Sequence, residues 1–448
     1  MHRYDIVVLG GGIGGYSCAI RASQLGKKVA LVEEREMGGT CLNRGCIPTK
    51  ALLRSAELYD LLTGSEEFGI NAGKTSFNLG KMMQRKAVVV SKLRGGVEFL
   101  LKKNDVKVIK GKGKFIAPQI VDTEGERVEG DHVVIATGSE SAEILGFDGK
   151  RVITSNEALA MEEFPSSMVV VGAGPIGVEF ATFFSSFGVK VDLIEMMEHI
   201  LPTLNDRKIT DMLRISLKKR GIEIKTGSSI DEIEKSEEKI RAILGDGGSV
   251  EGEKALVSIG RKLNSSGIGL EGMEMKTEKG RIQVNERMET SVEGVYAIGD
   301  VTGGMMLAHK AMHEGIIAAE NMAGEERDAD YSIIPSVVYS NPEVAWVGMT
   351  KEEAQQENIK TMIGECPFSV NGKALCEGEV FGTAKVVADR RGRIIGSQII
   401  GPQASILIEE LALAMKMGAN LEDISRLIHP HPTLGEVIFE ACSRALGR

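Results

Sequence analysis

Two short apolar runs flank a glycine-rich loop near the start of the chain. The run Asp5 to Leu9 predicts a buried strand, and the loop Gly10 to Gly15 leads into a helix and a second strand, Lys28 to Val32. A later apolar run, Met168 to Val171, is also followed by a glycine loop, Gly172 to Gly177. This alternation of strands and helices predicts an α/β fold with two β-α-β units.

The two units are copies of one another. Their glycine loops are 162 positions apart (172 − 10 = 162), and the same offset relates later residues without a gap. The matching pairs are Gly10 and Gly172, Gly12 and Gly174, Gly15 and Gly177, Ala19 and Ala181, Gly26 and Gly188, and Glu33 and Glu195. The sequence therefore carries an internal duplication.

Both loops have the spacing G-x-G-x-x-G, which alone is a weak signal. Here each loop follows a strand, opens a helix and precedes an acidic residue by about 20 positions, a context typical of dinucleotide binding. The glycines let the backbone approach a pyrophosphate, whose charge the helix N-terminus favours. Glu33 and Glu195 are expected to accept hydrogen bonds from ribose hydroxyls. The alternative is that both are solvated charges at the ends of strands. A carboxylate at Glu195 would repel a 2′-phosphate and favour NAD over NADP.

Composition and charge narrow the classes of function. The 448 residues include 54 Lys and Arg against 63 Asp and Glu, a net charge of −9, which argues against binding to nucleic acid. The N-terminus has no signal-peptide pattern, and no run of about 20 apolar residues predicts a membrane span. Six cysteines in a chain of this length do not form a disulfide framework. We therefore expect a cytoplasmic protein without membrane contact.

A cysteine pair, Cys41 and Cys46, follows the first unit. Two cysteines five positions apart on a regular helix lie about 8 Å apart, beyond the roughly 4.4–6.8 Å that a disulfide tolerates. A bond between them requires a deformed turn, which Gly45 and Pro48 permit. Such a disulfide would be of the labile, catalytic kind. Metal binding is less favoured because no further ligand cluster accompanies the pair, and two unrelated thiols are the remaining alternative.

Near the C-terminus, two prolines enclose a histidine. Pro430 and Pro432 interrupt any helix and predict an extended loop around His431, before an amphipathic run from Glu436 to Leu446. Thiol chemistry needs a proton acceptor that titrates near neutrality, and a carboxylate can orient such a histidine. Without further information, a surface histidine is the simpler interpretation.

The segment from Gly38 to Lys50, GGTCLNRGCIPTK, closely resembles the active-site segment of the class I pyridine nucleotide–disulfide oxidoreductases. The resemblance extends from Tyr4 to about Cys442 and includes Gly294 to Asp300 and Met306 to Ala311. It implies two Rossmann-like dinucleotide-binding domains, the first for FAD and the second for NAD, and a C-terminal α+β dimerisation domain. The implied boundaries are 1–141 (FAD), 142–266 (NAD), 267–333 (a central segment completing the FAD site) and 334–448 (dimerisation).

The resemblance also implies the residues of the two cofactor sites. Those expected at FAD are Gly10, Gly12, Gly15, Glu33, Thr40, Lys50, Gly113, Thr137, Gly138, Ser139, Asp300, Met306, Leu307, Ala308 and His309. Those expected at NAD are Gly172, Gly174, Pro175, Ile176, Gly177, Glu179, Glu195, Ile230 and Gly260, with Arg261 nearby. Lys50 and Glu179 are further expected to pair near the flavin, and no metal is implied.

The implied catalytic residues are Cys41, Cys46, His431 and Glu436. In the family, substrate reacts at the position of Cys41, Cys46 lies nearer the flavin, and the histidine–glutamate pair comes from the opposite subunit of a homodimer. The implied reaction is oxidation of protein-bound dihydrolipoamide with reduction of NAD. The partner would be a lipoyl-bearing protein of a 2-oxoacid dehydrogenase or glycine cleavage complex.

Two alternatives remain. The first is another disulfide or metal-ion reductase of the same family. Reductases of the family that use NADP normally carry basic residues after the second strand, whereas here Met196 and Met197 follow Glu195. Mercuric reductases carry a second cysteine pair near the C-terminus, whereas here Cys442 stands alone. The second alternative is a non-catalytic subunit that merely retains FAD.

Three local features are open at this stage. Arg44 stands between the cysteines, and we hypothesise that its charge lowers a thiol pKa. His429 either takes part in the chemistry or only shapes the loop. A helix predicted from Ser405 to Met417 carries an apolar stripe that fits an interface or a core equally well, formed by Ile406, Leu407, Leu411 and Ala414.

Overall fold

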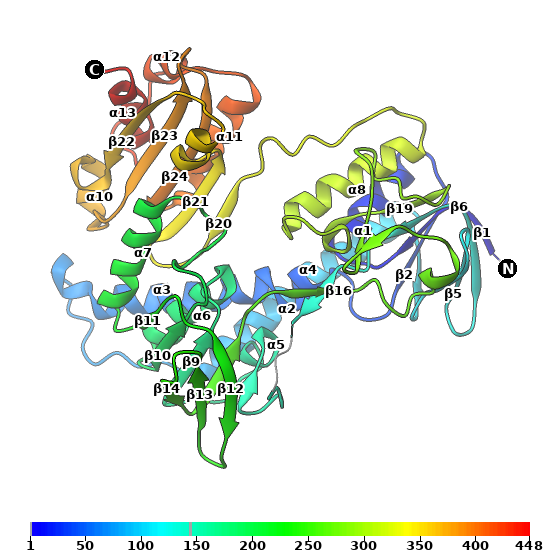
Figure 1. The fold of residues 1–448 in the computed structure, drawn as a ribbon, viewed down its shortest axis with the longest axis horizontal. Helices are drawn as coiled ribbons and strands as arrows, with labels where there is room; N and C mark the ends of the chain where they lie inside the picture. Colours follow the sequence, from blue (N-terminus) through cyan, green and yellow to red (C-terminus); the bar gives the residue numbers. More distant parts are fainter. Residues whose placement is uncertain (1, 143–145) are drawn as a thin grey trace. The chain divides into compact units, whose positions relative to one another are not determined.

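A computed structural model describes residues 2–142 and 146–448 (Figure 1). Met1 and residues 143–145, which fall within the predicted domain ranges, lie outside the described residues. The chain forms two compact units. Unit 1 contains residues up to 52, 80–142 and 260–330, and unit 2 contains 53–79, 146–259 and 331–448. Helix α3 (Cys46–Thr63) begins in unit 1 and ends in unit 2.

Unit 1 is built around a mainly parallel sheet in which β1 is central. The strand order is β3-β2-β1-β6-β5-β4, and β19 pairs with β6. The elements of this unit are β1 (His2–Leu9), α1 (Ile13–Gln24), β2 (Val29–Glu33), α2 (Gly39–Arg44), α4 (Leu79–Lys103), β3 (Lys107–Lys110), β4 (Lys114–Ala117), β5 (Ile120–Asp122), β6 (Arg127–Ile135), β7 (Ser139–Ser141), β16 (Arg261–Leu263), β17 (Thr277–Glu278), β18 (Arg281–Ile282), β19 (Val295–Ala297) and α8 (Ala308–Met322).

Both faces of the unit 1 sheet are buried. Ile6 and Val8 of β1 pack into one hydrophobic cluster, and Val7 and Leu9 pack into another on the opposite face, as the two-residue period of a strand requires. Helices α1 and α8 lie side by side on the first of these faces (Figure 1). This packing fixes the start of α1, and with it the first glycine loop.

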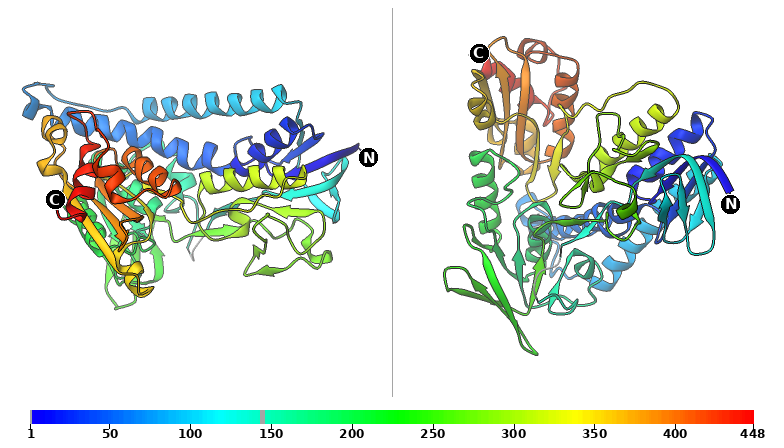
Figure 2. Two further views of the ribbon diagram at one scale, coloured as in Figure 1. Left: turned by 90° about the horizontal axis from the view of Figure 1, so that it is seen from above. Right: turned by 45° about the vertical axis from the view of Figure 1, so that its right-hand side comes forward.

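The N-terminal part of unit 2 repeats the arrangement of unit 1, with strand order β11-β10-β9-β15-β8. Its elements are β8 (Val152–Ile153), α5 (Ser155–Ala158), β9 (Ser167–Val171), α6 (Pro175–Ser186), β10 (Lys190–Ile194), α7 (Arg207–Lys219), β11 (Glu223–Lys225), β12 (Ile230–Lys235), β13 (Ile240–Leu244), β14 (Ser249–Gly252) and β15 (Lys254–Val257). The antiparallel strands β12–β14 form a separate small sheet (green in Figure 2).

The internal duplication extends to strand register. In unit 1, Ile6 of β1 pairs with Val29 of β2, and in unit 2, Met168 of β9 pairs with Val191 of β10. Both members of the second pair lie 162 positions after those of the first (168 − 6 and 191 − 29). The predicted duplication of one β-α-β unit is therefore present in the fold.

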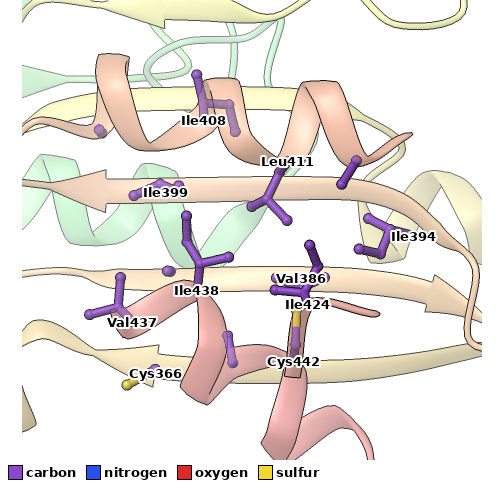
Figure 3. Close-up of a cluster of buried hydrophobic side chains, with 14 of the residues drawn as sticks. Cys366, Val386, Ile394, Ile399, Ile408, Leu411, Ile424, Val437, Ile438 and Cys442 are labelled. Atoms are coloured by element: carbon purple, nitrogen blue, oxygen red, sulfur yellow. The ribbon is translucent and has the colours of Figure 1, made fainter. Parts of the chain in front are cut away.

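The C-terminal part of unit 2 contains a five-stranded antiparallel sheet, β20-β21-β24-β23-β22. Its elements are β20 (Ser336–Val338), β21 (Glu343–Gly348), α9 (Lys351–Gln356), β22 (Thr361–Pro367), α10 (Gly372–Glu377), β23 (Thr383–Asp389), β24 (Ile394–Gly401), α11 (Ala404–Lys416), α12 (Leu421–Ser425) and α13 (Glu436–Ala445). Side chains of α11 and α13, among them Ile408, Leu411, Ile438 and Cys442, share one buried cluster with this sheet (Figure 3).

The helix predicted from Ser405 to Met417 is α11, shifted by one residue. Leu411 and Ala414 are buried in the cluster of Figure 3 and Leu407 packs against it, whereas Ile406 is 64% exposed. Most of the predicted stripe therefore belongs to the core. In the described part of the chain, none of the helices combines the length and the apolar run that crossing a lipid bilayer needs.

A buried ion pair ties α7 to the C-terminal sheet within unit 2. Lys385 of β23 lies 2.5 Å from Asp206, and their side chains are only 4% and 0% exposed. Asp206 also caps α7 by accepting a hydrogen bond from the amide of Ile209. Both charges therefore depend on each other for stabilisation away from water.

We predict that Lys385→Met lowers the free energy of unfolding by about 3–5 kcal/mol, because it leaves Asp206 as an unpaired buried carboxylate. Urea unfolding of the purified protein measures the change. Lys208→Met is the matched control, because the side chain of Lys208 is 53% exposed and that of its partner Glu365 is 29% exposed. That control should stay within about 1 kcal/mol of the original protein, and an equal loss in both variants would contradict the prediction.

Candidate functional site

The two glycine loops have the same three-part geometry. Gly10 and Gly172 have φ of +112° and +95°, and a Cβ at either would collide with a backbone carbonyl oxygen at 2.3 or 2.6 Å. At the third glycine of each loop, Gly15 or Gly177, a Cβ would lie 1.9 Å from a carbonyl oxygen of its own loop. These positions fix the turn and the close contact of helix with strand.

The second glycine of each loop faces open space. A Cβ at Gly174 would meet no described atom within 4 Å, and one at Gly12 would meet only the Cα of Gly39, at 3.9 Å. Both glycines directly precede a helix, α1 or α6, and α6 begins with Pro175, a residue that fits the first helical turn. Each loop thus offers main-chain amides and room for a pyrophosphate at a helix start.

The strand-end glutamates anchor the loops in the same way. Each carboxylate accepts one hydrogen bond from a main-chain amide of its glycine loop and a second from the amide of the residue two positions after the glutamate. The four contacts are Gly11 N to Glu33 Oε2 (2.6 Å), Arg35 N to Glu33 Oε1 (2.6 Å), Ala173 N to Glu195 Oε2 (2.7 Å) and Met197 N to Glu195 Oε1 (2.9 Å). Glu195 is only 6% exposed, so it is not a solvated strand-end charge.

The donors and acceptors of both loops fit a dinucleotide. A carboxylate has about four lone-pair sites, so Glu33 and Glu195 can accept a ribose hydroxyl in addition to their amide contacts. The amides at the helix start suit the pyrophosphate, and the open space at Gly12 and Gly174 gives the backbone access to it. The first loop lies in unit 1 and the second in unit 2.

Asp300 lies in a polar cluster of unit 1. Its Oδ2 accepts a hydrogen bond from the Ser139 hydroxyl and lies 3.7 Å from Nε of Arg261. Arg261 also donates from Nε to the Ser139 hydroxyl, at 2.7 Å. Arg261 was expected beside NAD, and the structure places it against residues expected beside FAD. Among the described residues, the contacts of the Asp300 carboxylate are all at Oδ2, which leaves Oδ1 for a polar ligand.

A second buried pair fixes the backbone before Asp300. Glu314 of α8 accepts the amide of Gly299 at 2.7 Å and pairs with Lys310, also at 2.7 Å. The side chains of Lys310 and Glu314 are 8% and 1% exposed. Sequence reasoning missed this pair, because i,i+4 lysine–glutamate pairs are common on solvated helix faces and carry no signal of burial.

The cysteine pair spans a break between two helices. α2 ends at Arg44, Gly45 follows as its C-cap, and α3 begins at Cys46. A Cβ on Gly45 would lie 3.0 Å from the carbonyl oxygen of Thr40 and 3.2 Å from the Cα of Cys41, so the tight turn between the cysteines needs a glycine there. The predicted deformation at Gly45 is present, and Pro48 lies in the first turn of α3.

The two cysteines are thiols in this structure, and they interact directly. A hydrogen bond with Cys46 and burial of the site raise the pKa of the Cys41 thiol, while the nearby Lys50 ammonium acts to lower it. Tyr16 lies close enough that Cys41 contributes, after burial, to the raised pKa of the tyrosine hydroxyl. The geometry is that of a dithiol that can close to a disulfide.

The guanidinium of Arg44 is directed to a carboxylate. Its Nη1 donates to Glu36 Oε2 at 2.9 Å. The pair lowers the pKa of Glu36, together with a backbone hydrogen bond and against the effect of burial. The cation among the main causes of the Cys41 pKa shift is Lys50, and Arg44 is not one of those main causes. The hypothesis that Arg44 tunes the thiols has no support in this geometry.

His431 and Glu436 form a hydrogen-bonded pair in unit 2. Glu436 is the first residue of α13, and its Oε1 lies 2.8 Å from Nδ1 of His431. Its Oε2 accepts the amide of Thr433 at 2.9 Å, and these two contacts lower the pKa of the Glu436 carboxyl. A proton on Nδ1 leaves Nε2 of His431 as the acceptor nitrogen. The His431 side chain is 76% exposed, which leaves this nitrogen accessible.

The remaining predicted residues fall as follows. Thr137 donates to the carbonyl of Asn264 at 2.7 Å within unit 1, and Glu179 of α6 accepts the amide of Tyr339 at 3.1 Å within unit 2. Ile230 begins β12 and packs partly against the core of the second unit. Ile176 follows Pro175 in α6 of unit 2. The others lie in unit 1: Thr40 in α2, Gly113 before β4, Gly138 before β7, Met306 and Leu307 before α8, Ala308 and His309 in α8, and Gly260 before β16.

Comparisons with known proteins agree over nearly the whole chain. Residues 4–315 match the family model described as pyridine nucleotide-disulphide oxidoreductase, and residues 334–442 match the dimerisation domain of that family. A dihydrolipoyl dehydrogenase of Bacillus subtilis is 45% identical over 468 aligned residues, covering 100% of this chain and 98% of the relative. The mitochondrial dihydrolipoyl dehydrogenase of Pisum sativum is 41% identical, covering 98% and 90%.

Solved structures show the same architecture. LpdA of Mycobacterium tuberculosis superimposes with a TM-score of 0.92 at 26% identity, covering 99% of both chains. The Cu(II) complex of RclA, an HOCl-induced flavoprotein disulfide reductase of Escherichia coli, superimposes with a TM-score of 0.90 at 26% identity, covering 99% of this chain and 100% of the other.

Proposed function

The chain belongs to the pyridine nucleotide–disulphide oxidoreductase family, and from this premise we propose that it oxidises protein-bound dihydrolipoamide to lipoamide and reduces NAD. The observation that carries the proposal is the Cys41–Cys46 pair, which is held in direct contact across the Gly45 turn. Full-length relatives at 40–45% identity that are named dihydrolipoyl dehydrogenase support the choice of substrate.

The proposed sequence begins with the cysteine pair as a disulfide. His431 Nε2 takes a proton from one substrate thiol, and the resulting thiolate attacks the sulfur of Cys41. A substrate–Cys41 bond forms, the Cys41–Cys46 bond breaks, and Cys46 leaves as a thiolate. The second substrate thiol passes its proton to the Cys46 thiolate and attacks the substrate sulfur of this mixed disulfide, and the leaving Cys41 thiolate takes the first proton from His431. Lipoamide leaves, and both cysteines are reduced, as in the structure.

The chain's own groups support each step. Contact with Cys46 and burial raise the pKa of the Cys41 thiol, and the Lys50 ammonium opposes them by favouring the thiolate. Glu436 orients His431 and stabilises its protonated ring. When bound, FAD would supply the two-electron chemistry that links the dithiol to NAD. The first glycine loop with Glu33 and Asp300 would hold FAD, and the second loop with Glu195 would hold NAD.

Four finer assignments belong to this proposal. The dimerisation domain supports a homodimer in which His431 and Glu436 serve the cysteines of the opposite subunit. The partner is a lipoyl-bearing protein of a 2-oxoacid dehydrogenase or glycine cleavage complex, and Lys50 pairs with Glu179 near the flavin. The boundaries 1–141, 142–266, 267–333 and 334–448 separate the FAD domain, the NAD domain, the central segment and the dimerisation domain.

Rates of NADH oxidation with different acceptors test the substrate class. We expect reduction of lipoamide to exceed reduction of glutathione disulfide or Hg²⁺ by at least about 100-fold. Faster reduction of either alternative acceptor would favour the other disulfide or metal-ion reductases of the family. Rapid NADH oxidation with a dye but with none of these acceptors would favour a non-catalytic subunit that retains FAD.

Glu195 is predicted to set the preference for NAD. The double change Glu195→Ala with Met196→Arg removes a buried carboxylate and introduces a cation at position 196, where the present Met196 is 67% exposed. It also releases the amides of Ala173 and Met197 as donors for a 2′-phosphate. We expect the ratio of kcat/KM for NADP to that for NAD to rise about 10-fold or more, since charge-assisted contacts contribute about 1.5–3 kcal/mol.

The control for this change is Glu198→Ala, which removes an exposed acidic residue of the same segment. Its coenzyme ratio should stay within about twofold of the original value. An unchanged ratio in the Glu195 variant, with FAD content and dye reduction preserved, would contradict the assignment of Glu195.

A further inference from the structure

A second histidine–carboxylate contact lies beside the first. His429 Nε2 is 3.1 Å from Oε1 of Glu410 on α11, and its Nδ1 is 3.2 Å from the carbonyl oxygen of Leu427. The ring also packs against Phe439 of α13, with 5.9 Å between ring centroids. The His429 side chain is only 9% exposed, against 76% for His431. The two histidines, two positions apart, therefore occupy opposite environments.

His429 connects a loop to two helices. Residues 426–435, here named the His431 loop, join α12 to α13. Helices α11 and α13 pack on the same sheet, as Ile408 and Ile438 show in Figure 3. Glu410 lies between the buried Ile408 and Leu411 on α11, so its backbone is fixed by the core. His429 thus anchors the N-terminal arm of the loop to the rigid part of the subunit.

The C-terminal arm of the loop has its own anchors. The carbonyl of Thr433 accepts a hydrogen bond from Nδ2 of Asn371 at 3.0 Å, and its amide donates to Glu436 at 2.9 Å. His431 lies between the two anchored arms. Because the His431 side chain is exposed, packing does little to fix its position, and its location depends on the backbone of the loop. A displacement of about 1 Å can cost a reaction about 100-fold.

We propose that His429 and Glu410 are positioning residues that hold the His431 loop so that His431 presents Nε2 to the substrate. This inference rests on the proposed function, in which His431 is the base. His429 does not exchange protons with the substrate in this account. Its buried ring acts through the backbone of Pro430, which restricts the conformations between the two histidines.

The test compares variants of the full-length, FAD-loaded protein. His429→Ala and Glu410→Ala should each lower kcat for NAD reduction by dihydrolipoamide by roughly 10- to 100-fold. KM for NAD, FAD content and NADH-to-dye electron transfer should stay close to the original values, because none of them uses His431. The double variant should be no slower than the slower single variant, because both changes break the same contact.

Two further variants separate positioning from general loss of structure. His429→Gln keeps a donor toward Glu410, and we expect at least a third of the original kcat. Glu409→Ala removes the neighbouring carboxylate of α11, which is exposed, and should change nothing. If either alanine variant folds poorly, Glu410→Leu removes the acceptor of His429 with a smaller change of side-chain volume, and its kcat should also fall.

The outcomes separate this inference from the proposed function. If the original protein fails to oxidise dihydrolipoamide, the proposed function is wrong. If it succeeds and the alanine variants keep their full kcat, or if their effects multiply in the double variant, the positioning role is wrong. A parallel loss of dye reduction and FAD would also overturn it, because the contact would then serve general stability.

Discussion

Replacing Cys41 by serine is expected to abolish oxidation of dihydrolipoamide while leaving NADH-to-dye electron transfer. A serine hydroxyl cannot form the mixed disulfide with substrate, so no substrate electron pair enters the protein. Dye reduction needs only the two cofactor sites, which we propose to be built on the glycine loops and on Asp300. The change is small, and Cys41 is half-buried at the helix break, so folding and FAD content should persist.

Cys376→Ser provides the matched control for the loss of a thiol. Cys376 is exposed on α10, and the variant should keep both activities. Steady-state rates of dihydrolipoamide oxidation and of dye reduction, each divided by bound flavin, give the comparison. Loss of both activities in Cys41→Ser with flavin retained would show that the division of roles between the two cysteines is wrong.

Replacing His431 by glutamine is expected to lower kcat for dihydrolipoamide by about 10²–10⁴-fold, the usual contribution of a general base. Glutamine keeps a polar group near Glu436 but does not accept a proton at neutral pH. Because the His431 side chain is 76% exposed, its removal should cost little stability. Dye reduction by NADH should be unchanged.

His2→Gln is the control for this variant, since the His2 side chain is 70% exposed at the N-terminus of β1. It should have the original kcat. A His431→Gln variant that retains more than about a tenth of the original kcat would exclude His431 as the base.

The glycine loops and their glutamates could be predicted from the sequence because their geometry is local. The close approach at Gly15 and Gly177 is to the first glycine of the same loop, five positions earlier (15 − 10 and 177 − 172), and φ is positive at that first glycine. The same holds for the turn at Gly45, which the cysteine spacing itself requires.

Contacts between distant parts of the chain could not be predicted. Arg261 lies 39 positions before Asp300 and 122 after Ser139 (300 − 261 and 261 − 139), and no periodic pattern relates the three. The Asp206–Lys385 pair spans 179 positions. Arg44 suggested a cation for the thiols, but only the fold shows that it is paired with Glu36.

The apolar stripe of α11 shows a different limit. A helical period predicts which residues share a face, but it does not say whether that face meets its own core or another surface. Leu411 and Ala414 turned out to be buried against the sheet, and Ile406 on the same predicted stripe is exposed. The role of His429 was open for the same reason, because its partner Glu410 lies on this helix.

The most direct test of the account is the initial rate of NAD reduction by dihydrolipoamide on the purified, flavin-loaded protein, with NADP measured alongside. The account predicts a fast rate with NAD and a rate at least about 100-fold lower with NADP, because the buried carboxylate of Glu195 repels a 2′-phosphate. A negligible rate with NAD despite bound flavin would contradict the proposed reaction, and equal rates with both coenzymes would contradict the role of Glu195.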